Sequence, residues 1–268
     1  MQPNWIYITV ASFLSYFVLR RLLPKKSILD KLSEEEKSVK VFFINNQVKR
    51  ESIISSLFSS DEDSYIGCSL SEKICRGIRD CIKSLKGDDD EKKVKEIHFV
   101  VDTPGGALSA ITSIVEILKE YQSLGGLVKV YAPYRAQSAG TILALAANEI
   151  YANSTTRFSY IDVQMGLPFL GSYSIKDFID LEKQYPSVIT AIFAKEARRT
   201  ENTYKKLIDK ICDCDKAKAE TVWKSLVEHD SLHGEIVSPG LLEKLGFKVH
   251  YGEGSIPSKY MKLFSRER

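Results

Sequence analysis

The serine Ser138 stands in "YRAQSAGTILALAAN", residues 134–148, between a polar run and a series of small and apolar residues. The residues after it predict a helix, which places the serine at the N-terminal tip of that helix. Its hydroxyl is then either a nucleophile or a hydrogen-bonding cap, because serine is a favoured capping residue. The predicted helix is apolar on every face, which indicates that it is buried and that its N-terminus is held rigidly. A surface cap does not need such burial, so the pattern favours a nucleophile.

A second turn with chemical potential is "DTPGG", residues 102–106. Both turns lie where a predicted strand ends and a predicted helix begins, and such turns leave backbone N–H groups without partners. An attacked carbonyl develops a negative charge that two fixed N–H donors can stabilise, and glycine lets the backbone approach closely. We therefore expect Gly106 and Ala139 to provide an oxyanion hole for acyl transfer. Asp102 is expected to cap its own backbone at the turn.

The elements around these turns alternate between strand and helix patterns. Strands are predicted over residues 39–45, 94–102 and 126–133 and in two short pieces over 149–164, from their apolar and β-branched residues. Helices are predicted over residues 70–85, 107–124 and 187–211, and "LLEKLGFKVHYG" predicts a closing helix and strand. The alternation is typical of an α/β domain, which we place at residues 38–268.

The N-terminus has the pattern of a membrane anchor. Residues 5–19 carry no charge and are followed by Arg20, Arg21, Lys25 and Lys26. We assign residues 1–24 to a transmembrane helix that contacts the membrane through residues 5–23, and residues 25–37 to a charged connector. The basic residues after the apolar run place the N-terminus outside and the domain in the cytoplasm. A buried or peripheral amphipathic helix is the alternative.

Composition excludes several other classes of protein. The net charge is only +3, and the basic residues form no stripe interleaved with aromatic residues, so a nucleic-acid partner is not indicated. The five cysteines are odd in number and show no metal-ligand spacing, which predicts reduced thiols in a cytosolic compartment. "CDC", residues 212–214, has no matching His or Cys pair nearby, so we predict neither a metal nor a cofactor.

The segments "VVDTPGGALSA" and "APYRAQSAGTILALAANEIYAN" resemble the Clp protease and crotonase superfamily. Within it, the chain most resembles the serine dehydrogenase proteinase family of membrane-anchored serine peptidases, which is related to signal peptide peptidase A. The resemblance implies a stack of β-β-α units, assembly into a homo-oligomeric ring, and a peptide or protein substrate. It also implies that Ser138 is the nucleophile and that Gly106 and Ala139 supply the oxyanion donors.

The general base departs from the Clp pattern, because no histidine follows the strand that contains "YIDVQMG". Relatives of signal peptide peptidase use a downstream lysine instead, and a neutral amine can accept the proton of a serine. Alignment by eye favours Lys195 or its neighbour Glu196. Helical periodicity places Glu196 at the edge of the apolar stripe and Lys195 nearly opposite, which favours Glu196 as the inward residue. Lys195 is still the first choice, because in an assembled ring it could face the serine of a neighbouring subunit. The other candidates are Lys176, Lys183, Lys205, Lys206 and His233.

Three functions follow from these observations. The first is a membrane-anchored serine peptidase that acts through an acyl-enzyme on Ser138, with Lys195 as the first choice of base. The second is a ring of the same fold that binds peptides without cleaving them, because its base has been lost. The third is a crotonase-like site in which the same N–H donors stabilise a thioester enolate, for which a nucleophilic serine is unnecessary.

Overall fold

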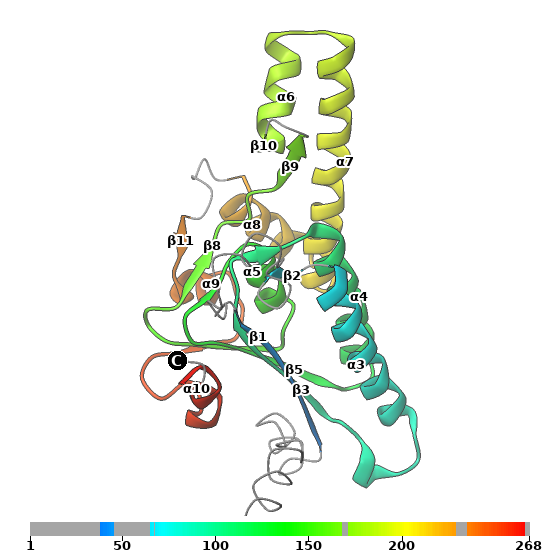
Figure 1. The fold of residues 1–268 in the computed structure, drawn as a ribbon, viewed down its shortest axis with the longest axis vertical. Helices are drawn as coiled ribbons and strands as arrows, with labels where there is room; N and C mark the ends of the chain where they lie inside the picture. Colours follow the sequence, from blue (N-terminus) through cyan, green and yellow to red (C-terminus); the bar gives the residue numbers. More distant parts are fainter. Residues whose placement is uncertain (1–37, 46–64, 67, 168–170, 229–234, 266–268) are drawn as a thin grey trace, which may run out of the picture. The chain divides into compact units, whose positions relative to one another are not determined.

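A computed structural model describes residues 38–45, 65–66, 68–167, 171–228 and 235–265 of the chain (Figure 1). The chain divides into two compact units, residues 1–36 and 37–268, and the described residues all belong to the second unit. The predicted anchor (1–24) and connector (25–37) lie outside the described residues. Within the described ranges, no helix combines the length and the apolar character that crossing a membrane requires.

A parallel sheet of five strands forms the centre of the described domain (Figure 1). Its order is β1-β3-β5-β7-β12, and each neighbouring pair is parallel. The strands are β1 (Val39–Asn45), β3 (Glu96–Asp102), β5 (Leu127–Ala132), β7 (Glu149–Ala152) and β12 (Val249–Tyr251). Each strand was predicted within a few residues of these bounds, so the expectation of an α/β fold is confirmed.

The first part of the domain repeats a unit of a sheet strand, a short second strand and a helix. The three successions are β1, β2 (Tyr65–Ile66) and α3 (Cys68–Lys86); β3, β4 (Gly105–Gly106) and α4 (Leu108–Ser123); and β5, β6 (Arg135–Ala136) and α5 (Ala139–Leu145). The short strands pair among themselves, β2 with β4 and β6 with β8 (Arg157–Ser159), and β8 also pairs with β11 (Ile236–Val237). This order matches the β-β-α units that the resemblance implied.

The core lies between the sheet and the helices of these units. Ile97, Phe99 and Val101 of β3 alternate with residues on the other face and join a buried cluster with residues of α3, α4 and α5. All residues of α5 are buried, as its uninterrupted apolar sequence predicted. Burial on all sides fixes the position of this helix, and therefore the position of the serine at its start.

The second part of the domain is mainly helical. A two-stranded antiparallel ribbon of β9 (Gln164–Leu167) and β10 (Gly171–Ser174) leads into α6 (Ile175–Gln184), which packs against α7 (Val188–Ile211). Ser174 and Ser187 begin these two helices with reciprocal capping boxes. The remaining helices are α8 (Lys216–Leu226), α9 (Pro239–Lys244) and α10 (Ser258–Ser265), and a short 3-10 helix, η2 (Asp90–Lys92), follows α3.

Candidate active site

The two turns singled out in the sequence lie against each other. The N–H of Thr103 donates to the carbonyl O of Arg135 at 3.2 Å, and the N–H of Gln137 donates to the carbonyl O of Thr103 at 3.1 Å. Thr103 is fully buried, and its Cγ2 lies 2.6 Å from the place that a Cβ on Gly140 would occupy. Only glycine therefore permits this contact, which fixes the start of α5 against the turn after β3.

Ser138 has a backbone conformation that residues with a side chain rarely adopt. Its φ is 50° and its ψ is −114°, at the residue that immediately precedes α5. Holding a non-glycine residue in such a region costs on the order of 1–3 kcal/mol, which the surrounding structure must offset. The serine occupies the N-cap position, yet its side chain makes no capping hydrogen bond. The explanation of Ser138 as a helix cap therefore fails, and its hydroxyl is left for another role.

Ser159 on β8 holds this strained backbone in place. The N–H of Ser138 donates to Ser159 Oγ at 2.8 Å, and Ser159 Oγ donates to the carbonyl O of Tyr160 at 3.0 Å. The N–H of Ser159 also donates to Thr141 Oγ1 at 3.1 Å, and Thr141 Oγ1 donates to the carbonyl O of Ala136 at 2.8 Å. Ser159 and Thr141 are buried, so these bonds exchange little with water. Neither residue carries a local sequence pattern that relates it to Ser138.

The glycines of the first turn approach the serine and leave an N–H group directed away from the neighbouring strand. A Cβ on Gly105, whose φ is +139°, would lie 2.9 Å from Ser138 Cβ and 3.3 Å from Ser138 Oγ. The N–H of Ala107 donates to Ile66 O on β2 at 2.9 Å. Successive N–H groups of an extended chain point to opposite sides, so the N–H of Gly106 points away from β2. Ala139 is the first residue of α5, where N–H groups lack acceptors within the helix.

Asp102 has a different partner from the one expected. Its carboxylate accepts a hydrogen bond from Arg135 Nε at 2.8 Å, and the two side chains form an ion pair. Asp102 is buried and Arg135 is partly exposed. The prediction that Asp102 caps its own backbone is thus corrected: the carboxylate ties the end of β3 to the start of β6, and so joins the two turns. Both residues lie in the motifs already quoted, but nothing in the sequence pairs them.

The predicted base region lies on α7. Lys195 and Glu196 are both exposed, and Glu196 pairs with Arg199 at 3.1 Å along the same helix. The prediction that Glu196 faces inward is therefore wrong. The buried side of this part of α7 consists of Thr190, Ala194 and Ala197, which lie next to α6. Within one protomer, the structure does not bring Lys195 to the serine turn, and its contact with a neighbouring subunit stays a prediction.

Two other lysines from the sequence line a cavity of about 400 Å³ beside α6. Lys176, in the first turn of α6, is half-buried, and its Nζ donates to the carbonyl O of Glu228 at 3.0 Å. Lys183 is exposed and pairs with Asp180 at 2.8 Å. The lining also includes Asp162, three residues beyond Ser159 in the chain. Of the two lysines, Lys176 is the more enclosed.

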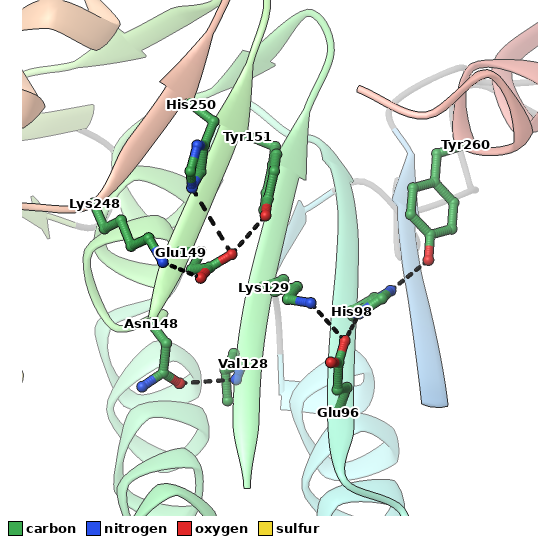
Figure 2. Close-up of polar contacts among 10 residues, drawn as sticks. All are labelled: Glu96, His98, Val128, Lys129, Asn148, Glu149, Tyr151, Lys248, His250 and Tyr260. Atoms are coloured by element: carbon green, nitrogen blue, oxygen red, sulfur yellow. Dashed lines mark hydrogen bonds and ion pairs between the residues drawn. The ribbon is translucent and has the colours of Figure 1, made fainter. Parts of the chain in front are cut away.

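The histidines within the described ranges serve the structure of the sheet (Figure 2). His98 lies on β3 on the face opposite its core residues, hydrogen-bonded to Tyr260 of α10 and, at 2.7 Å, to Glu96. His250 on β12 stacks on Tyr151, with the ring centroids 4.6 Å apart. His98 is buried and occupied by these partners, which argues against a role beside Ser138. His229 and the candidate base His233 lie outside the described residues.

Glu96 and Glu149 organise the same face of the sheet (Figure 2). Burial opposes ionisation of Glu96, but hydrogen bonds from Lys129 and His98 hold its pKa below the ordinary value. Hydrogen bonds from Lys248 and Tyr151 hold the pKa of Glu149 low in the same way. Burial, followed by the contact with Glu149, raises the pKa of Tyr151 to about 12. The hydrogen bonds and ion pairs of these groups hold neighbouring strands of the sheet together.

No metal site accompanies the serine turn in the part of the chain that the structure describes. Groups of three or more histidine, cysteine, aspartate or glutamate side chains suited to a metal ion are absent there. Of the cysteines whose side chains are described, Cys75, Cys81 and Cys212 are buried free thiols and Cys214 is an exposed free thiol.

A family model for the ClpP-like SDH-type serine proteinases matches residues 4–266. The chain belongs to this family. The resemblance inferred from the two turns is confirmed, and the parallel sheet together with the match identifies a ClpP-like α/β fold. The family is one of serine proteinases, so the crotonase-like alternative loses its support.

Relatives of this ClpP-like SDH-type proteinase chain include two proteins of Methanocaldococcus jannaschii. Uncharacterized protein MJ0137 is 28% identical over 254 residues, which cover 91% of this chain and 79% of the relative. Uncharacterized protein MJ1495 is 28% identical over 204 residues, which cover 74% of this chain and 63% of the relative. The match thus spans less than two thirds of the second relative.

A solved structure with a similar course of the chain is that of a membrane-bound stomatin-specific protease, a mutant in complex with a substrate peptide. The two chains are 19% identical with a TM-score of 0.47, and the match covers 74% of each.

Proposed function

We propose that the protein is a membrane-anchored serine peptidase that hydrolyses peptide bonds through an acyl-enzyme on Ser138. The observation that carries the proposal is the backbone of Ser138, held at φ 50° without a capping bond from its side chain. Such strain persists only where other contacts enforce it, and it is concentrated at functional sites. Ser159, Thr141 and Gly105 enforce it here.

In the proposed reaction, Ser138 Oγ attacks the carbonyl carbon of a peptide and its proton passes to a neutral lysine amine. The carbonyl oxygen becomes an oxyanion, which accepts hydrogen bonds from the N–H groups of Gly106 and Ala139. The lysine then protonates the departing amine, and the first product leaves an acyl ester on Ser138. Water hydrolyses this ester with the same lysine as base, which restores the serine.

Lys176 is the base that we propose for a single protomer. Lys176 is tied by backbone hydrogen bonds to the segment that begins at Ser159, the residue that contacts Ser138. In that segment, the N–H of Ile161 donates to Leu226 O at 2.8 Å, and Val163 O accepts from the N–H of Ile175 at 2.9 Å. Lys176 follows Ile175 directly and reaches Glu228, close in sequence to Leu226. The lysine is therefore attached to the segment whose Ser159 contacts Ser138.

We further propose that residues 5–23 hold the enzyme in a membrane with the peptidase domain in the cytoplasm, and that the protein assembles as a homo-oligomeric ring. The uncharged run and the basic residues that follow it support the first proposal. Membership in a ClpP-like family supports the second. A base supplied by Lys195 of an adjacent protomer is the alternative to Lys176 in such a ring.

The test is cleavage of casein by the detergent-solubilised full-length protein and its variants. We expect Ser138→Ala to remove activity and Lys176→Met to lower kcat by about 100-fold or more, since general base catalysis contributes about that factor. Lys183→Met, in the same cavity, is the matched control and should retain activity. Lys176→Arg keeps a long basic side chain but cannot supply a neutral amine, because a guanidinium stays protonated, so it should be as inactive as Lys176→Met.

Mixing variants distinguishes a base within the protomer from a base supplied by a neighbour. If Lys195→Met is inactive and regains activity when it is assembled with Ser138→Ala, the base comes from the adjacent subunit and Lys176 is not the base. If the wild-type protein forms a ring and binds casein without cleaving it, the peptidase proposal fails and a binding ring takes its place.

A further inference from the structure

The closed end of the α6–α7 hairpin exposes apolar side chains. Val188 is 78% exposed, and Ile189 and Ile192 are 65% and 60% exposed. These three residues share one side of the first turns of α7, because neighbours on a helix surface are three or four residues apart. Tyr185 and Leu181 of the α6 end are also exposed. We call these five residues the hairpin tip.

The exposed set is not needed to hold the two helices together. Phe178 of α6 and Phe193 of α7 pack against each other with ring centroids 5.7 Å apart, and Ala194 and Ala197 are fully buried on the same side. An ion pair between Arg198 and Glu182 also joins the helices. The two helices are therefore held together without the apolar side chains of the hairpin tip, which face outward. Contiguous exposed apolar surface of this kind marks a contact with a partner.

The charges around the hairpin tip indicate the kind of partner. Between Lys183 on α6 and Lys195 on α7, the chain "QYPSVITAIFA" contains no charged residue. Each of these lysines has a glutamate beside it in the chain, Glu182 or Glu196, and these two carboxylates pair with Arg198 and Arg199. Lys183 pairs with Asp180, whereas Lys195 has no ion pair among the residues that the structure describes. An uncharged apolar end bordered by one lysine on each helix matches the layers of a lipid surface, with acyl chains below and phosphate groups above. A tyrosine at that boundary is typical of the membrane interface.

We propose that the hairpin tip inserts into the surface of an anionic lipid bilayer. Val188, Ile189 and Ile192 enter the boundary between headgroups and acyl chains, and Lys183 and Lys195 remain among the lipid phosphates. The contact is peripheral and does not span the bilayer. It would act together with the anchor proposed above and would orient the domain at the membrane, but it does not depend on the serine chemistry.

The test uses the full-length chain in vesicles, with an environment-sensitive fluorophore (NBD) on Val188→Cys and with Cys68 and Cys214 replaced by serine. Vesicles of phosphatidylcholine with one quarter phosphatidylserine should shift the emission to the blue and raise its intensity by about twofold or more. Nitroxide lipids labelled near the headgroup should quench it. The matched control is a label at Asn202→Cys, an exposed position farther along α7, which should show neither effect.

Three further variants keep the result decisive. Ile189→Asp should abolish the spectral change at position 188, whereas Leu124→Asp, at an exposed leucine after α4, should not. Replacing Lys183 and Lys195 by glutamine should remove the preference for anionic over neutral vesicles. An emission spectrum at position 188 that lipid leaves unchanged overturns the proposal. A change that depends on protein concentration without lipid also overturns it, because the tip would then contact a second copy of the chain. Casein cleavage is not the readout, so the failure of either proposal is recognised separately.

Discussion

The hydrogen bond from the N–H of Ser138 to Ser159 Oγ, at 2.8 Å, connects the strained serine turn to strand β8. Through it, a residue far along the chain determines where the proposed nucleophile stands. We assign Ser159 the role of positioning Ser138, and we do not expect it to contact the substrate.

Replacing Ser159 by alanine is therefore expected to lower kcat by about 10- to 100-fold with little change in KM, since small displacements of reacting groups have effects of that size. The partly buried N–H of Ser138 would lose its acceptor, at a cost of about 1–3 kcal/mol in the free energy of unfolding. Casein cleavage and urea denaturation measure the two effects. Ser154→Ala, at an exposed turn, is the control. An unchanged kcat in Ser159→Ala would show that the bond does not position the serine.

Gly105→Ala should inactivate the enzyme through a direct clash with the nucleophile. A Cβ at this position would lie 2.9 Å from Ser138 Cβ, closer than such atoms approach, and the φ of +139° is also unfavourable for alanine. Gly125→Ala is a matched control, because its φ is +85° but no atom lies within 4 Å of the added Cβ. Both variants should lose about 1 kcal/mol of stability or more, since alanine is strained at positive φ. Only Gly105→Ala should lose activity, and equal activity in the two would contradict the proposed site.

The ion pair between Asp102 and Arg135 is expected to stabilise the two turns together. Asp102→Ala leaves the partly buried guanidinium without its partner and should destabilise the domain by about 1–3 kcal/mol, with a loss of casein cleavage. The control is Asp80→Ala, which removes an exposed pair with Lys83 and should change stability by less than about 1 kcal/mol. Thermal unfolding compares them. If both variants unfold alike, the Asp102 pair has no special structural role.

The carboxylate of Glu149 should make the domain less stable in acid. Its pKa is held below its ordinary value of 4.5, so its contribution is fully present above pH 4.5 and is lost as the pH falls through the lowered pKa. At pH 7, Glu149→Gln should lower the free energy of unfolding by about 1–2 kcal/mol, because Lys248 and Tyr151 lose an ionised acceptor. The difference from wild type should shrink as the pH falls below 4.5. Urea denaturation at pH 7 and pH 4 measures it, and a difference that grows in acid would contradict the assignment.

The sequence predicted the parts of the fold that depend on local patterns. The strand at 96–102 and the buried helix after Ser138 follow from apolar runs, which report burial directly. The two-residue strands β4 and β6 were interpreted only as turns, because segments so short have no periodicity. Their pairing with β2 and β8 is a property of the assembled domain.

The errors arose where a side chain depends on partners distant in sequence. Periodicity describes one face of α7 but cannot say that its first turns pack against α6 alone, which leaves Glu196 exposed. The partner of Asp102 is Arg135, and neither residue carries a pattern that identifies the other. Ser159 was missed for the same reason, since a serine within a strand has no local feature that relates it to Ser138.

The proposed reaction requires that Ser138 becomes acylated. Acid-quenched mass spectrometry of the enzyme mixed with a p-nitrophenyl ester of a short peptide detects that acyl group. We expect a rapid burst of p-nitrophenol and an acyl group that peptide mapping locates on Ser138, both absent from Ser138→Ala. Casein cleavage that proceeds without any acyl group on Ser138, or at an undiminished rate in Ser138→Ala, would contradict the proposed reaction.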